Sequence, residues 1–237
     1  MLLWLLAFAF GEPVPASAEV VHVNSGTGFF ISRQGDILTS AHVLKGCAGI
    51  TVQGAVTPRD ATLVARDEAH DLALLKVDAV TNEAAALRDP DWPVAIGEGV
   101  AIIGYPGESF KTLTTVTREA EITSDKGPRG EEAWVQISDR IEQGNSGGPL
   151  LDMAGNVIGV IMAKAIVYTY HKNAPDDGEY SHSGVAIAVP VVRAFLDAHG
   201  VTYAITDVGG VLGGDRITDY AHRFIVNVRC EMPEERP

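Results

Sequence analysis

The chain has 237 residues, of which 46% are hydrophobic and 21% are charged. This composition is typical of a folded globular protein and excludes an intrinsically disordered one. The 31 acidic and 18 basic side chains give a formal net charge of −13, and lysine and arginine form no run. Because phosphate binding requires a basic patch, this charge disfavours nucleic acid as a partner.

The N-terminus resembles a secretory signal peptide. Leu2 to Phe10 form an apolar run of the length typical of a signal-peptide core, and the small residues Ala16, Ser17 and Ala18 provide a cleavage site. We therefore predict a signal peptide over residues 1–18 and an exported protein, periplasmic or secreted. The run is too short to span a bilayer, which takes about 20 residues, so no stable membrane insertion is expected after cleavage. No lysine or arginine precedes the run, which leaves an uncleaved anchor as the alternative.

Two cysteines, Cys47 and Cys230, allow a single intramolecular pairing. In an exported protein this disulfide is plausible, because the compartment is oxidising. A bridge that closes so long a loop would be worth about 5 kcal/mol in the chain-entropy model. Two free buried thiols are the alternative.

From residue 20 onward the sequence contains short runs rich in valine, isoleucine and threonine, separated by turn residues. Such runs predict β-strands. The tetrad Arg33-Gln34-Gly35-Asp36 between two of them predicts a hairpin turn. No helical segments of crossover length separate the runs, so we expect antiparallel barrels or a sandwich and not a parallel sheet. The predicted strands cover residues 20–23, 29–32, 37–40, 50–53, 62–65, 72–77, 100–103, 113–117, 133–137, 157–163 and 185–189.

One helix is predicted late in the chain. Pro190 suits the first helical position, apolar residues recur on one face over 191–196, and Gly200 stands where the helix is expected to stop. Beyond it, residues 205–214 are rich in glycine and 223–228 resemble a strand.

The segment Gln143 to Leu150 is the most informative stretch for chemistry. It places Ser146 among three glycines and a proline, which predicts a sharp turn with an exposed hydroxyl. The amides of Gly144 and Ser146 can point to one spot, as an oxyanion hole requires. A glycine-rich hairpin loop with an incidental serine is the alternative.

An activated serine needs a base and a group that orients the base. His42 follows a predicted strand in a context of small residues, and Asp71 stands at the start of the apolar run 72–77. Each has a structural alternative, because a strand-end histidine can simply cap a strand and an aspartate can simply form a turn. His70 is expected to point to the opposite strand face from Asp71 and is treated as a supporting residue.

The motifs TSAHV at residues 39–43, HDLALLKV at 70–77 and GNSGGPL at 144–150 follow one another in the order His, Asp, Ser. In this order they resemble the chymotrypsin-like, or trypsin-like, serine peptidases, and most closely the protease domain of the bacterial HtrA (Deg) branch. The resemblance spans about residues 20–200 and includes SGTGF at 25–29, IGYPG at 103–107 and GNVIGV at 155–160.

The resemblance implies an all-β fold of two packed six-stranded antiparallel β-barrels with a C-terminal helix. The expected domains are a first barrel at 19–108, a second barrel with the helix at 109–203, and a C-terminal extension at 204–237. Only 37 residues follow Gly200, which is too few for the PDZ domains that usually follow in HtrA-type enzymes.

The resemblance also implies a mechanism for a serine endopeptidase. Ser146 attacks the peptide carbonyl, His42 moves the proton, and Asp71 orients the imidazole. Gly144, Asn145 and Ser146 form the expected oxyanion loop, with the Gly144 and Ser146 amides as donors. No metal and no organic cofactor is required, and the expected partners are polypeptide substrates. The oligomeric state and the preferred substrate side chain are left open, although residues 138–143 are expected to line the primary specificity pocket.

Two other functions remain open at this point. The segment Gln143 to Leu150, which we call the nucleophile turn, also satisfies G-x-S-x-G, the motif of α/β-hydrolases. Asp177 and His199 would be the later partners of the serine. That fold needs alternating strands and helices before the serine, and the pattern lacks them. The second alternative is a catalytically silent trypsin-like scaffold used for protein binding.

Overall fold

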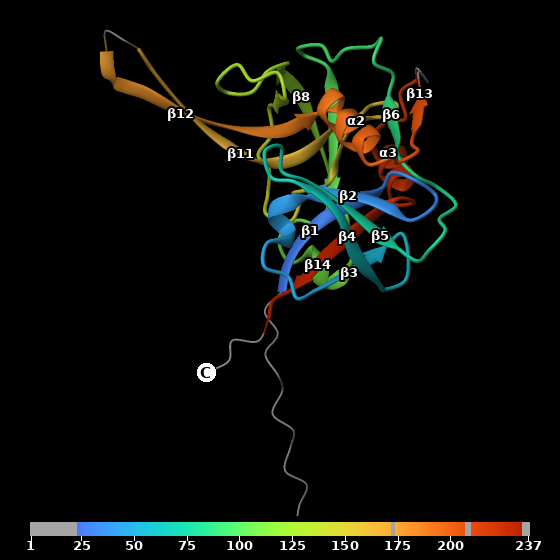
Figure 1. Cartoon of the computed structure of the whole chain (residues 1–237). Coiled ribbons are helices and arrows are strands. Elements are labelled where there is room, and N and C mark those ends of the chain that lie inside the picture. The colour runs from blue at the N-terminus through green and yellow to red at the C-terminus, as the bar shows by residue number, and fades with distance from the viewer. Residues whose placement is uncertain (1–22, 172–173, 207–209, 234–237) are drawn as a thin grey trace, which may run out of the picture.

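The computed structural model describes residues 23–171, 174–206 and 210–233, and within these ranges residues 163–182 by their backbone alone. The strands form two β-barrels that pack against each other (Figure 1). The predicted signal peptide lies outside the described residues. Within the described ranges, no helix combines the length and the hydropathy needed to cross a bilayer.

The first barrel is a closed ring of six strands in the order β1-β14-β3-β4-β5-β2. Neighbouring strands in this ring are antiparallel, and closure leaves no free strand edge. Figure 1 shows β14, in red, among the blue and teal strands of the first barrel. The strands are β1 Val23–Phe30, β2 Asp36–Ser40, β3 Gly49–Gly54, β4 Arg59–Asp67, β5 Leu72–Val77 and β14 Ile225–Glu231.

The second barrel is also a ring of six antiparallel strands. The strands run in the order β10-β7-β8-β9-β12-β11, and pairing between β10 and β11 closes the ring. Two short strands extend this sheet: β6 pairs in parallel with β11, and β13 pairs in parallel with β6. The bounds are β6 Ala86–Arg88, β7 Gly99–Gly104, β8 Val116–Ser124, β9 Trp134–Ile137, β10 Pro149–Asp152, β11 Val157–His171, β12 Ala174–Ala188 and β13 Ala204–Thr206.

The predicted fold class, two six-stranded antiparallel barrels with a C-terminal helix, is confirmed. The helix is α2, Val189–Ala198, with proline in its first turn as expected. The described part of the chain also contains the one-turn α1, Ser109–Thr112, the 3₁₀ helix η1, Ala41–Leu44, and α3, Gly214–Ala221. Helix α3 is not among the predicted elements, because its first residues continue a glycine-rich segment.

The arrangement of barrels differs from the expected domain boundaries in two places. The predicted C-terminal extension, 204–237, lies outside both predicted barrels, whereas β14 is a paired strand of the first barrel. The predicted first barrel, 19–108, includes β7, whereas β7 belongs to the second barrel. A strand pattern shows that a segment is extended, but it does not show which sheet the segment joins.

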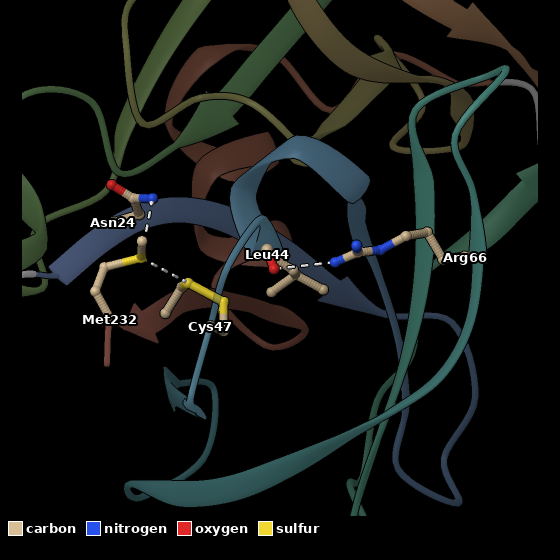
Figure 2. The surroundings of a disulfide bond; sticks show 6 residues. Asn24, Leu44, Cys47, Arg66 and Met232 are labelled. Atoms are coloured by element: carbon tan, nitrogen blue, oxygen red, sulfur yellow. Dashed lines mark hydrogen bonds between the residues drawn. A yellow bond between two sulfur atoms is a disulfide. The ribbon is translucent and has the colours of Figure 1, made fainter. Parts of the chain in front are cut away.

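The predicted disulfide is present between Cys47 and Cys230, whose Cα atoms are 5.2 Å apart. It ties the segment after η1 to β14 and joins two cysteines that are 183 positions apart in the sequence. On the other side of η1, the guanidinium of Arg66 donates a hydrogen bond of 2.9 Å to the carbonyl of Leu44 (Figure 2). The end of η1 is therefore held between a covalent bridge and a charged donor from β4.

The cores of the two barrels meet along β7. Val100 and Ile102 point into the core of the second barrel, whereas Ala101 and Ile103 belong to the larger core that contains the first barrel. This alternation is the two-residue period of a strand buried on both faces. The packing between the barrels is thus apolar and continuous, and it fixes the position of one barrel relative to the other.

Strands β11 and β12 are much longer than the predicted runs 157–163 and 185–189. Each has 15 residues, and their outer parts pair with each other as far as His171 and Ala174. Figure 1 shows this ribbon projecting away from the second barrel. β12 pairs with β9 only over Gly184–Ile187. The outer ribbon is therefore an isolated two-stranded arm within the described backbone.

Candidate active site

His42 and Asp71 form a close pair at one end of the first barrel. The Nδ1 atom of the His42 ring lies 2.6 Å from Oδ2 of Asp71, and the His42 backbone N–H donates to Oδ1 at 2.8 Å. One carboxylate therefore holds both the ring and the backbone of the histidine. The His42 side chain is 48% exposed and that of Asp71 19% exposed, so the imidazole stands at the surface and its carboxylate partner lies beneath it.

The strand register explains why these two residues meet. β2 and β5 are antiparallel neighbours, and Ser40 at the end of β2 lies opposite Leu72 at the start of β5. The residues just outside this pair, Ala41 and Asp71, are joined by a backbone hydrogen bond of 3.0 Å from the Ala41 N–H to the Asp71 carbonyl. Asp71 has a φ of 55°, which is unusual for a residue with a side chain. Such strain is typical of positions held by their surroundings for a function.

The turn before Asp71 is stabilised by a second aspartate–histidine pair. The side chain of Asp67 accepts hydrogen bonds from the amides of Ala69 and His70, and its Oδ2 lies 2.7 Å from the Nδ1 atom of the His70 ring. Burial acts to raise the pKa of Asp67, but these hydrogen bonds and the charge of His70 outweigh it and hold that pKa below its ordinary value. His70 therefore has the supporting role expected from the sequence.

The nucleophile turn is shaped by hydrogen bonds to its carbonyl groups. Gly107 donates its N–H to the carbonyl of Gln143 at 2.8 Å. Because the C=O and the following N–H of a trans peptide point in opposite directions, the Gly144 N–H points away from Gly107. Gly144 has a φ of 100°, and a Cβ there would lie 2.3 Å from the carbonyl oxygen of Tyr105. Only glycine fits this position.

The next peptides of the turn are fixed in the same way. The carbonyl of Asn145 accepts the N–H of Gly148 at 2.9 Å, so the Ser146 N–H points to the opposite side of that peptide. The Asn145 N–H is itself used, because it donates to the carbonyl of Glu142 at 3.1 Å. Among the described backbone groups, no carbonyl accepts the N–H of Gly144 or Ser146. Of the three residues of the expected oxyanion loop, these two therefore offer free donors.

The turn around Ser146 packs directly against the segment that carries His42. A Cβ on Gly147 would lie 2.6 Å from the backbone nitrogen of Ser40. A Cβ on Gly26 would lie 2.6 Å from Val43 and 3.1 Å from the carbonyl oxygen of Ser146. These close approaches, made possible by glycine, bring residues on both sides of His42 against the nucleophile turn. The three residues predicted from the sequence thus lie in one region where the barrels meet.

The hydroxyl of Ser146 donates a hydrogen bond of 3.0 Å to the carbonyl of Met162 in β11. The hydroxyl has a single proton, so in this structure the proton is directed at Met162 and not at the imidazole. Catalytic hydrogen bonds are often long or misaligned in ligand-free sites and tighten when substrate binds.

A charged network supports the segment before the nucleophile. Arg118 in β8 holds both carboxylate oxygens of Asp139, and its Nη1 atom donates to Glu142 at 2.9 Å. The hydrogen bonds from Arg118 hold the pKa of Asp139 below its ordinary value, although partial burial acts in the opposite direction. The same pairs raise the pKa of Arg118. This network ties residues 139–142 to β8 and supports the Glu142 carbonyl that receives the Asn145 amide.

The fold and this site define a class of protein: two antiparallel six-stranded barrels that meet at a histidine–aspartate pair and a glycine-bounded serine. Residues 26–160 match the family model of the trypsin-like peptidase domain, and the chain belongs to this family. The parallel strand and helix layers of an α/β-hydrolase are not what the described residues form, so that alternative is wrong.

The relatives of the chain include serine proteases, one of which is DegP-like. The chain is 36% identical over 174 residues to serine protease Rv3671c of Mycobacterium tuberculosis, covering 65% of this chain and 43% of that protein. It is 31% identical over 166 residues to a probable periplasmic serine endoprotease, DegP-like, of Rhizobium meliloti, covering 70% of this chain and 31% of that protein. The chain thus spans less than half of the length of either relative.

A solved structure supports the same assignment. The HtrA-type protease AlgW, determined with a decapeptide, superposes with a TM-score of 0.58 and 27% sequence identity, over 73% of this chain and 51% of that one. The protein therefore has an HtrA-type protease domain fold. This confirms the family resemblance found in the motifs.

Proposed function

We propose that the protein is a serine endopeptidase that hydrolyses peptide bonds through an acyl-enzyme intermediate. The observation that carries this proposal is the double contact between Asp71 and His42, at 2.6 Å to the ring and 2.8 Å to the backbone. A carboxylate at Nδ1 keeps a proton on that nitrogen, which leaves Nε2 of His42 as the basic atom. A histidine held in this way is prepared to accept a proton from a serine hydroxyl.

The proposed reaction has two halves. In the first, Ser146 Oγ bonds to the substrate carbonyl carbon while its proton passes to Nε2 of His42, and the amides of Gly144 and Ser146 stabilise the negative oxygen. The C–N bond then breaks, the leaving amine takes the proton from His42, and an ester to Ser146 remains. In the second half, water gives a proton to His42 and attacks the ester, and Ser146 recovers its proton as the carboxylic acid leaves.

We also propose that the substrates are polypeptides and that the protein acts after export. The names of relatives as serine proteases and the decapeptide in the AlgW structure support a polypeptide substrate. The Cys47–Cys230 disulfide supports an oxidising compartment, since such bridges are rare in reducing ones. The signal peptide proposed for residues 1–18 agrees with this location.

A fluorophosphonate tests the proposed nucleophile, because this reagent phosphonylates only an activated serine. We expect one equivalent to add to the wild-type protein, as measured by intact mass, and we expect the Ser146→Ala variant to remain unmodified. Ser124→Ala is the matched control, since Ser124 lies at the end of β8 and its hydroxyl accepts a local amide hydrogen bond from Lys126. This control variant should be modified like the wild type.

The alternative of a silent scaffold predicts a different result. A folded wild-type protein that takes up no fluorophosphonate and cleaves no member of a peptide library would exclude the peptidase and favour a binding role. Modification that persists in Ser146→Ala would show that another serine is the nucleophile.

A further inference from the structure

We infer that the buried hydroxyl of Thr27 is a positioning group for the oxyanion hole. Thr27 lies in β1 of the first barrel and is 0% exposed. Its hydroxyl donates a hydrogen bond of 2.6 Å to the carbonyl of Gly144, and it accepts one of 3.0 Å from the N–H of Tyr105. A side chain of the first barrel thereby holds two loops of the second. This role rests on the proposed function, because it concerns the oxyanion loop of that reaction.

The backbone of Thr27 contacts the same turn on the other side of the serine. The Thr27 N–H donates to the carbonyl of Ser146 at 2.9 Å. The hydroxyl of Thr39, three residues before His42, donates to the Thr27 carbonyl at 2.7 Å. Thr27 therefore connects the strand that leads to the histidine with the turn that carries the serine.

The two contacts of Thr27 fix the peptide planes that flank the nucleophile. With the Gly144 carbonyl held by Thr27, the Asn145 N–H must point the other way, and there it donates to Glu142. With the Ser146 carbonyl held, the Gly147 N–H likewise points away and donates to Ile161 at 2.7 Å. The peptide between these two planes carries the Ser146 N–H, so its direction is set by planes that Thr27 holds.

The space around the Thr27 hydroxyl leaves little room for a different side chain. A Cβ on Gly104 would lie 2.7 Å from Oγ1 of Thr27 and 2.7 Å from Oδ1 of Asn145. The glycine therefore leaves room for the hydroxyl and for the turn, and for little more. Serine would keep both hydrogen bonds, whereas valine has the same shape as threonine but would leave the Gly144 carbonyl and the Tyr105 N–H buried without a partner.

The three variants Thr27→Ser, Thr27→Ala and Thr27→Val test this role. Loss of a whole oxyanion donor lowers kcat by about 10²–10³. A donor that remains but is displaced should cost less, so we expect Thr27→Val and Thr27→Ala to lower kcat by about 10- to 100-fold with KM nearly unchanged. Thr27→Ser should stay within about threefold of the wild type, because the hydroxyl is restored.

A second measurement separates positioning from general loss of structure. A peptidyl boronic acid forms a tetrahedral adduct with the nucleophile, and its charged oxygen occupies the oxyanion hole. Its inhibition constant should rise in Thr27→Val by about the same factor as kcat falls, whereas binding of a cleaved product peptide should not change. Both are measured well below the unfolding temperature of each variant. If Thr27→Val does not fold, the comparison of Thr27→Ala with Thr27→Ser decides, since these two differ by one oxygen atom.

The outcomes distinguish this role from the proposed function. An active wild type with a folded Thr27→Val or Thr27→Ala variant that keeps full kcat and full boronate affinity overturns the role of Thr27 and leaves the peptidase intact. Equal losses in boronate and product binding also overturn it, because they indicate a general disturbance. A wild type that neither cleaves peptides nor binds the boronate overturns the proposed function, and the role of Thr27 with it.

Discussion

If the proposed function is correct, we expect the His42→Ala variant to lose about six orders of magnitude in kcat, the loss that follows removal of the base from a Ser-His-Asp triad. Without the imidazole, no group beside Ser146 accepts its proton, and the bound carboxylate of Asp71 has no ring to orient. The fold should persist, because the His42 side chain is 48% exposed and fills no core position. Initial rates on a cleavable peptide, together with a thermal unfolding curve, measure both effects.

His70→Ala is the matched control for this variant. His70 is the next residue to Asp71 and also pairs with an aspartate, Asp67, through its Nδ1 atom. We expect this control to keep kcat within about tenfold of the wild type, because His70 supports the turn and does not move the proton. Undiminished peptide cleavage by His42→Ala would remove His42 from the role of base.

The second large effect is expected for Asp71→Asn, which should lower kcat by about 10⁴. An asparagine keeps the shape of the side chain and can still accept the His42 N–H through its carbonyl oxygen. Its NH₂ group then faces Nδ1 of the ring, so the imidazole must carry its proton on Nε2, the atom that has to accept the serine proton. The variant is measured by kcat at neutral pH, with the fluorophosphonate rate as a second readout that should fall in parallel.

Asp67→Asn is the corresponding control, because Asp67 makes the same kind of contact to a histidine outside the proposed triad. The pKa of Asp67 lies below its ordinary value, so its contribution to folding stability is present at neutral pH and is lost as the pH falls through the lowered pKa. The control should therefore lose some stability near pH 7 but keep kcat. Equal kcat losses in the two variants would indicate that Asp71 acts through the fold alone.

The positions of many strands could be predicted from the sequence where apolar residues form a continuous run. The run at 72–77 is β5 to the residue, because a fully buried strand is marked along its whole length. The predicted strands at 20–23 and 29–32 leave out residues 25–28, which are the middle of β1. Their glycines do not end the strand. They admit neighbouring chains, since a Cβ on Gly28 would lie 2.9 Å from the carbonyl oxygen of Leu38.

The partner of a strand was harder to predict than its existence. Residues 223–228 were recognised as a strand, and the structure places the strand at Ile225–Glu231. Its place between β1 and β3 follows from closure of a barrel, which is a property of the whole ring and has no local sequence signal. The outer arm of β11 and β12 was also missed. Its β12 half has Pro175, Asp176, Asp177 and Gly178 near its start, which are residues depleted in strands, although the β11 half is rich in strand-forming residues.

The candidate site was predicted to the extent that its residues have distinctive neighbours. His42, Asp71 and Ser146 stand in short motifs in a fixed order, and the structure brings His42 and Asp71 into contact. The groups that hold the turn have no such signature. Thr27 is one residue in a glycine-rich segment, and Arg118 is one charge in a polar strand, so their roles become visible only when the barrels are packed together.

The central claim is that the imidazole of His42 and the hydroxyl of Ser146 act on the same substrate carbonyl. Peptidyl chloromethyl ketones test it most directly, because such a reagent adds its ketone carbon to the serine and its methylene to the histidine. With a set of these reagents that differ in the side chain beside the ketone, we predict alkylation of His42, mapped by mass spectrometry, at a rate that collapses in Ser146→Ala. Alkylation of another histidine, or of His42 at an equal rate in Ser146→Ala, would contradict the account.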